Sequence, residues 1–96
     1  MTSYRLDIRQ PAAEAIRRLP PDVKRAVKAA IRNLGANPLL GEPLQRELEG
    51  RFKFRVRRYR IIYIIDRPSR AVRILAVGHR RTIYEELADR SRQVRR

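Results

Sequence analysis

The residues best suited to chemistry lie in one basic stretch, Arg51–Arg60 (RFKFRVRRYR). It carries six cations in ten residues and no acid. In a β-strand, alternation would place its apolar residues on one face and its cations on the other. The apolar set is Phe52, Phe54 and Val56, and the cationic set is Lys53, Arg55 and Arg57. Like charges on one face repel each other, so the pattern indicates a polyanionic partner, and nucleic acid is the obvious candidate.

Metal-independent RNA cleavage is the reaction that such a surface could support. The RNA 2′-hydroxyl attacks the adjacent phosphorus, so the protein supplies positioning, charge stabilisation and proton transfer rather than a nucleophile. Neighbouring cations disfavour the protonated form of Lys53, which could make it a general base. A phenol such as Tyr84 could shuttle a proton or orient the hydroxyl. The acids noted near the patch are Glu47 and Glu49, in the preceding loop, and no Ser-His-Asp set or glycine-rich phosphate loop is present.

A β-hairpin would bring the cations together. If Phe52–Arg57 and Tyr59–Asp66 pair around residues 57–58, Arg55 opposes Arg60 and Lys53 opposes Ile62. Directly opposed residues share a face, so Lys53, Arg55 and Arg60 converge on one surface. The turn lacks the Asn-Gly or Gly-X signal of a two-residue hairpin, so we predict a four-residue loop, Val56–Tyr59, in the same register.

Further candidates follow the last predicted strand. Arg80 and Arg81 lie just beyond it and should approach the same surface, although a solvated side chain is the simpler interpretation of Arg81. Tyr84 begins the next helix, where its spacing also fits a core or rim tyrosine. His79 alone is more typical of a packed or hydrogen-bonded histidine than of a catalytic one.

The rest of the chain predicts an α+β domain. Tyr4–Arg9 alternates as a strand, helical spacing follows Pro11, and a second amphipathic helix starts at Pro21. After a loop at Leu39–Gly50 come strands at Phe52–Arg57, Tyr59–Asp66 and Ala71–Val77, then a short helix over about Thr82–Asp89. Ile61–Ile65 is apolar on both faces and should form the central strand. The prediction is a mostly antiparallel four-stranded sheet in the order β-α-α-β-β-β-α, with the helical hairpin packed on one face.

The length and composition limit the kinds of protein that this chain can be. The 96 residues predict one domain, 1–96, with a frayed basic tail at 90–96. The chain has no cysteine and one histidine, so we expect no metal site and no cofactor. No apolar run could span a bilayer and no signal core is present, which indicates a cytosolic protein without a membrane partner.

The net charge of +14 is unevenly distributed. Residues 1–50 hold nine basic and six acidic residues, whereas residues 51–96 hold fifteen and four. Only three of the cations are lysine, and arginine pairs bidentately with phosphate. The sheet-forming half is therefore the electropositive half. The alternative is a solvated surface in an arginine-rich proteome.

The strand pair FKFRVRRYRIIYIID, followed by ILAVGHRRTIY, resembles the signature of RelE/ParE-superfamily toxins of bacterial type II toxin–antitoxin systems. The helical hairpin and the loop L-x-x-E-L-E-G at Leu44–Gly50 agree with this resemblance, which covers residues 4–87. It implies a RelE/ParE-like fold and a cognate antitoxin as partner. The RelE branch cleaves mRNA in the ribosomal A site, whereas the ParE branch poisons DNA gyrase.

The RelE resemblance implies roles for individual residues. The catalytic set would be Lys53, Arg60, Arg80 and Tyr84, with His79 as a possible accessory residue because some relatives use a C-terminal histidine. The remaining cations, expected to bind RNA phosphates, are Arg51, Arg55, Arg57, Arg58 and Arg81. Tyr84 departs from the best-known spacing, and arginine at position 55 stands where a second lysine is typical.

The resemblance therefore favours a ribosome-dependent mRNA interferase whose partners are the ribosome, mRNA and an antitoxin, and whose free form is monomeric. A gyrase poison and a non-catalytic RNA-binding module are the alternatives. The gyrase poison predicts DNA damage signalling without cut mRNA. The binding module predicts salt-dependent RNA binding without a product.

Overall fold

The apolar run Ile61–Ile65 lies at the centre of the sheet, as its composition predicts. The computed structural model describes residues 3–87, in which β4 is the middle strand of the order β1-β5-β4-β3-β2. In chain order the elements are β1 (Arg5–Ile8), α1 (Gln10–Arg17), α2 (Pro21–Ala36), β2 (Glu42–Pro43), β3 (Phe52–Val56), β4 (Tyr59–Asp66) and β5 (Ala71–His79). Single 3-10 turns occupy Pro38–Leu40 and Arg46–Leu48, and residues 83–87 are helical.

The sheet is mostly antiparallel, as predicted. Within residues 3–87, β1 pairs in parallel with β5, whereas the β2–β3, β3–β4 and β4–β5 pairs are antiparallel. In the part of the chain that the structure describes, the sheet has five strands rather than four, because the two-residue β2 joins the edge of β3. A two-residue strand is too short to show an alternating pattern, so the sequence predicted only a loop at Leu39–Gly50.

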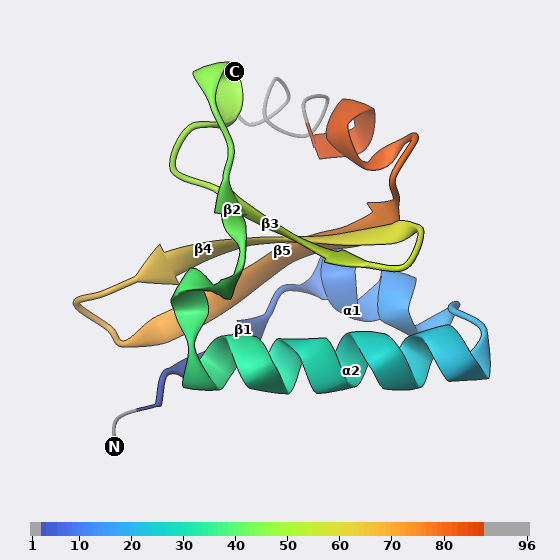
Figure 1. Ribbon diagram of the computed structural model, residues 1–96, viewed down its shortest axis with the longest axis horizontal. Coiled ribbons are helices and arrows are strands. Elements are labelled where there is room, and N and C mark those ends of the chain that lie inside the picture. Colours follow the sequence, from blue (N-terminus) through green and yellow to red (C-terminus); the bar gives the residue numbers. More distant parts are fainter. Residues whose placement is uncertain (1–2, 88–96) are drawn as a thin grey trace.

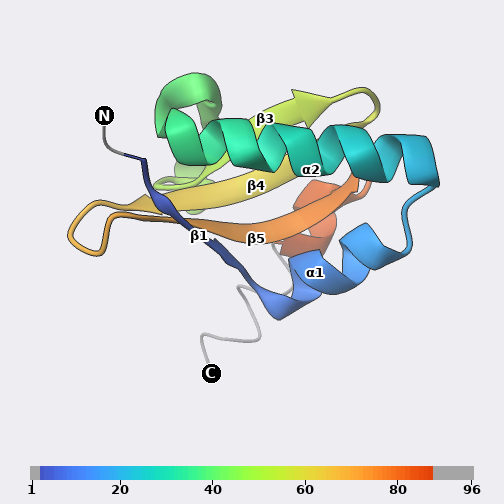
Figure 2. The same ribbon diagram turned by 90° about the horizontal axis from the view of Figure 1, so that it is seen from below.

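The two N-terminal helices cover one face of the sheet, which we call the helix face (Figures 1 and 2). Prolines begin both: Pro11 lies in the first turn of α1 and Pro21 in that of α2, where the missing N–H costs no helical hydrogen bond. Their apolar stripes bury against β3, β4 and β5 in the main core. It includes Ala12, Ile16, Val27, Ile31, Leu34, Val56, Ile61, Tyr63, Val72, Ile74 and Val77.

A second, smaller core lies on the opposite face, which we call the second face. Ile62 of β4 and Ala76 of β5 pack there against Ile83 and Leu87 of the helical segment at residues 83–87. Figure 1 shows this segment, in orange-red, on the side of the sheet away from α1 and α2. Gly78 leaves the space for it, since a Cβ there would lie 2.8 Å from Cδ1 of Ile83.

The last predicted helix, Thr82–Asp89, is therefore present over residues 83–87. Its predicted end and the predicted frayed tail at 90–96 lie outside the described residues. Within residues 3–87, no helix combines the length and apolarity that a membrane crossing requires.

Candidate nucleic-acid interface

The β3–β4 hairpin has the predicted register. Arg55 pairs with Arg60, Lys53 with Ile62 and Val56 with Tyr59. Because Ile62 belongs to the small core, Lys53, Arg55 and Arg60 all lie on the second face. Lys53 and Arg60 are half-buried and Arg55 is exposed.

The predicted four-residue loop is wrong. Val56 and Tyr59 remain paired, so the turn consists of Arg57 and Arg58 alone. Arg57 adopts the left-handed conformation (φ +56°) without being glycine. Its guanidinium lies 3.0 Å from the carboxylate of Asp22 at the start of α2.

The placement of Arg57 beside Lys53 and Arg55 is therefore also wrong. Its side chain contacts the helical layer instead. A hydrogen bond from the backbone N–H of Val23, with a smaller contribution from Arg57, lowers the pKa of Asp22. Arg58 is exposed at the tip of the hairpin.

The cations at the hairpin end are held by backbone contacts. Nη1 of Arg60 donates to the carbonyl oxygens of Tyr59 (2.9 Å) and Arg57 (3.2 Å). The backbone N–H of Arg80 donates to the carbonyl of Arg58 at 2.8 Å, which fixes the post-strand arginine beside the hairpin turn. Arg80 and Arg81 are both exposed. The expected approach of Arg80 to the hairpin is thus present.

Tyr84 and the loop before β3 border the same face. Tyr84 is half-buried and packs on the small core, together with Leu44 and Leu48. Arg51, half-buried before β3, closes this loop: its N–H donates to the Leu48 carbonyl (3.2 Å), and its own carbonyl accepts from Leu44 (2.8 Å). Figure 1 shows the green loop and the orange-red helical segment on the same side of the sheet.

His79 lies apart from this group. It pairs with Tyr59 across the ladder, and their rings meet edge to face at 5.8 Å. Tyr59 in turn opposes Val56 of the main core, so both rings lie on the helix face. Nδ1 of His79 accepts the backbone N–H of Arg81 at 3.2 Å, which is a structural use of the ring.

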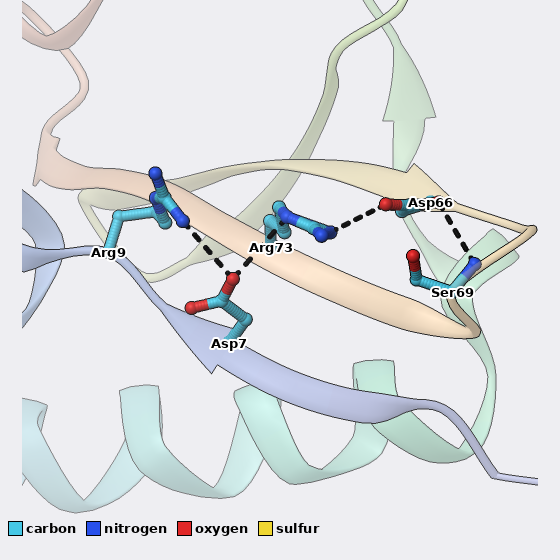
Figure 3. A network of polar contacts seen from close by, with 5 residues as sticks. All are labelled: Asp7, Arg9, Asp66, Ser69 and Arg73. Carbon is cyan, nitrogen blue, oxygen red and sulfur yellow. Dashed lines mark hydrogen bonds and ion pairs between the residues drawn. The ribbon is translucent and has the colours of Figure 1, made fainter.

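The two ends of the second face differ in charge pairing. At the far end, Nη1 of Arg73 lies 2.9 Å from Asp66 and its Nε 3.4 Å from Asp7, which also contacts Arg9 (Figure 3). A hydrogen bond from the backbone N–H of Ser69, supported by Arg73, lowers the pKa of Asp66. At the hairpin end, by contrast, none of Lys53, Arg55, Arg60 and Arg80 forms an ion pair with any residue in 3–87. The cations at the hairpin end therefore lack the acidic partners that Arg73 has at the far end.

Sequence reasoning missed one acid. Glu42 of β2 pairs directly with Lys53, so their side chains emerge on the same face. No local pattern marks this contact, because it depends on the pairing of a two-residue strand.

A second surface lies at the other edge of the sheet. A groove of about 400 Å³ runs between β1, α1 and α2, with an apolar floor and four cations on its rim. Leu6 and Ile8 of the edge strand are 36% and 42% exposed there. The lining residues are Leu6, Ile8, Ala13, Ile16, Ile31, Arg17, Lys24, Lys28 and Arg32.

Comparison with known proteins places the chain in a family. Residues 6–84 match the family model described as the ParE toxin of the type II toxin–antitoxin system parDE. Toxin RelG of Mycobacterium tuberculosis is 40% identical over 83 residues, covering 84% of this chain and 95% of RelG. Toxin RelE of the same organism is 35% identical over 83 residues, and the match covers 84% of this chain and 86% of RelE.

The fold agrees with these relatives. The crystal structure of the toxin–antitoxin complex RelBE2 from M. tuberculosis matches with a TM-score of 0.76 and 36% identity, over 81% of this chain and 99% of the matched chain. Sequence, family model and fold therefore agree: the chain belongs to the RelE/ParE superfamily of type II toxins.

Proposed function

We propose that this toxin is a ribosome-dependent mRNA interferase. The observation that carries the proposal is the set of cations without ion pairs on the hairpin end of the second face. Three come from one hairpin, and Arg80 is held beside its turn by a 2.8 Å backbone hydrogen bond. Such a cluster suits a phosphate that gains charge in the transition state.

In the proposed reaction the 2′-hydroxyl of the A-site codon attacks the adjacent phosphorus. The products are a 2′,3′-cyclic phosphate and a 5′-hydroxyl. Arg60 and Arg80 hold and neutralise the phosphate, Lys53 acts as base or electrostatic stabiliser, and Tyr84 orients the nucleotide. Arg80 also stabilises the leaving oxygen, while Arg51, Arg55, Arg58 and Arg81 contact flanking phosphates. Arg57, paired with Asp22, contributes less.

Primer extension on a defined mRNA in a reconstituted translation reaction tests this function. Wild-type protein should cut within A-site codons, and Arg80→Ala should cut about a hundredfold more slowly, because one stabilising donor is lost. Arg67→Ala is the matched control: this arginine is also exposed, but it lies in the turn at the far end of β4. Equal cleavage by wild type and Arg80→Ala would remove Arg80 from the mechanism.

A gyrase poison is the second candidate, because the matching family model is that of the ParE toxin. It predicts cleaved DNA in the presence of gyrase and intact mRNA in the translation reaction. Absence of any mRNA cut by folded wild-type protein would favour this function.

We further propose that a cognate antitoxin covers the groove between β1, α1 and α2. RelBE2, the structural relative, is a toxin–antitoxin complex. The apolar floor and cationic rim suit a segment that alternates apolar and acidic side chains. The edge of β1 offers it a strand to pair with, since among the described strands β1 has a neighbour on one side only.

Co-purification after co-expression with the protein of the adjacent reading frame tests this surface. Ile8→Glu should weaken capture at least tenfold, because it places a charge in the apolar floor. Leu39→Glu changes an equally large apolar residue, 62% exposed and outside the groove, and should leave capture intact. Loss of capture in both variants, or in neither, would contradict the assignment.

A further inference from the structure

The turn that follows β5 carries Arg80, and three hydrogen bonds from consecutive backbone N–H groups fix its path. The N–H of Arg80 donates to the carbonyl of Arg58 at 2.8 Å, and that of Thr82 donates to the carbonyl of His79 at 3.1 Å. Between them, the N–H of Arg81 donates to Nδ1 of the His79 side chain at 3.2 Å. Two of the three acceptors thus belong to His79, so the position of this residue decides where the turn runs.

The bond to Nδ1 also fixes the protonation of the ring. Because Nδ1 accepts a hydrogen bond from a backbone N–H, it carries no proton, and the proton of the neutral imidazole lies on Nε2. The acceptor is attached to Cγ and reaches the N–H of the residue two positions later, as the side-chain oxygen of an asparagine does in an Asx turn. The turn therefore uses His79 as a hydrogen-bond acceptor at one defined atom.

The ring of His79 is itself held by Tyr59. The two residues pair across β4 and β5, and their rings meet edge to face at 5.8 Å on the helix face. The carbonyl of Tyr59 accepts a hydrogen bond from Nη1 of Arg60 at 2.9 Å. The Tyr59–His79 pair is thus connected to both arginines that hold the phosphate in the proposed reaction, to Arg60 through a backbone carbonyl and to Arg80 through the turn. Both rings lie on the face opposite to the phosphate, so His79 acts on the reaction through Arg80.

We infer that His79 is a positioning residue of the cleavage reaction: its Nδ1 atom holds the turn in the conformation that presents Arg80 to the phosphate. The inference rests on the proposed nuclease function. Arg80 is exposed, so the place of its guanidinium relative to the hairpin depends on the backbone that carries it. Without the Nδ1 acceptor, the Arg81 N–H loses its partner and the turn gains conformations in which Arg80 lies away from Arg60. A misplacement of about 1 Å at a catalytic site costs up to about a hundredfold in rate.

Single-turnover cleavage of mRNA on purified ribosomes tests the inference with two amides, His79→Asn and His79→Gln. The asparagine oxygen lies as many bonds from the backbone as Nδ1, whereas the glutamine oxygen lies one carbon further out. At saturating toxin, His79→Asn should cleave within about threefold of the wild-type rate and His79→Gln about thirtyfold more slowly. Ribosome affinity should match wild type in both, because neither substitution removes a cation. Both variants lose the ring contact with Tyr59, so urea denaturation should give them equal midpoints.

A double variant checks that His79 acts through Arg80. In the Arg80→Ala background, His79→Gln should cause no further loss, whereas a residue that supported only the fold would lower the rate by the same factor in either background. Equal losses in the two amides would overturn the inference and indicate proton transfer by the ring, since neither amide titrates. Wild-type rates in both amides, or additive losses in the double variant, would also overturn it. In all of these results the wild-type protein cuts; its failure to cut at all would refute the proposed nuclease function itself, and the inference with it.

Discussion

At the residue scale, the function of each cation depends on what lies beside it. Arg57 and Arg73 carry the same charge as Arg60, yet each forms ion pairs with carboxylates. Arg57 contacts Asp22, and Arg73 contacts Asp7 and Asp66. Within residues 3–87, by contrast, Arg60 and the cations beside it at the hairpin end of the second face form no ion pair. Charge count alone therefore overstates the binding surface.

Lys53 offers a test at this scale. If its role is to supply positive charge beside Glu42, Lys53→Arg should keep cleavage within about tenfold of wild type, whereas Lys53→Ala should lose about a hundredfold. Arginine retains the charge but cannot accept a proton, so a base at this position would be lost in both variants. Cleavage rates on purified ribosomes distinguish the two roles, with Arg67→Ala as the control for general effects of charge removal.

At the element scale, the two-residue β2 has an importance out of proportion to its length. The Tyr63 hydroxyl joins it to the main sheet through Pro38 and Gly41. Burial raises the pKa of Tyr63, which keeps the hydroxyl protonated and able to donate. The position of β2 on the sheet thus depends on the Tyr63 side chain of β4 rather than on the two residues of β2 themselves.

Tyr63→Phe should destabilise this junction. The substitution leaves the Gly41 N–H and the Pro38 carbonyl without their partner, at a cost of about 1–3 kcal/mol in the free energy of unfolding. Urea denaturation measures the loss. Tyr4→Phe is the matched control, because within residues 3–87 no hydrogen bond involves the Tyr4 hydroxyl. An unfolding free energy for Tyr63→Phe equal to that of the control would show that the junction contributes no stability.

At the scale of the whole molecule, the two faces of the sheet have different roles. The helix face holds the main core and stabilises the domain, while the second face carries the small core and the open cations. The net charge of +14 gives the molecule a long-range attraction for RNA. The proposed cleavage depends on the local cluster of cations in addition.

Salt dependence separates these two contributions. Binding of wild-type protein to a single-stranded RNA oligonucleotide should weaken steeply as salt rises. Arg80→Ala should reduce the slope of log K against log salt by about 0.7, the value for one phosphate contact on a single strand. Fluorescence anisotropy over a salt series measures both slopes. Arg67→Ala should leave the slope unchanged, and an equal reduction in both variants would indicate diffuse attraction without a defined site.

Local patterns in the sequence were enough to predict the central elements of the fold. Period-two alternation in Phe52–Val56 and the apolar run Ile61–Ile65 indicate a hairpin in the middle of a sheet. With the turn placed at residues 57–58, they also predict the register that joins Arg55 to Arg60. The apolar stripes and starting prolines specify the two helices. These features are predictable because the information lies in neighbouring residues, whose spacing fixes which side chains share a face.

Contacts between distant segments, by contrast, depend on the folded structure. It turned Arg57 onto Asp22, 35 residues away, which supports a tight turn that no glycine marks. It placed His79 on the helix face and Glu42 opposite Lys53. Such contacts join distant segments through packing and strand pairing, so no local periodicity encodes them. The acid–lysine pair at the candidate site becomes visible only once β2 is seated on the sheet.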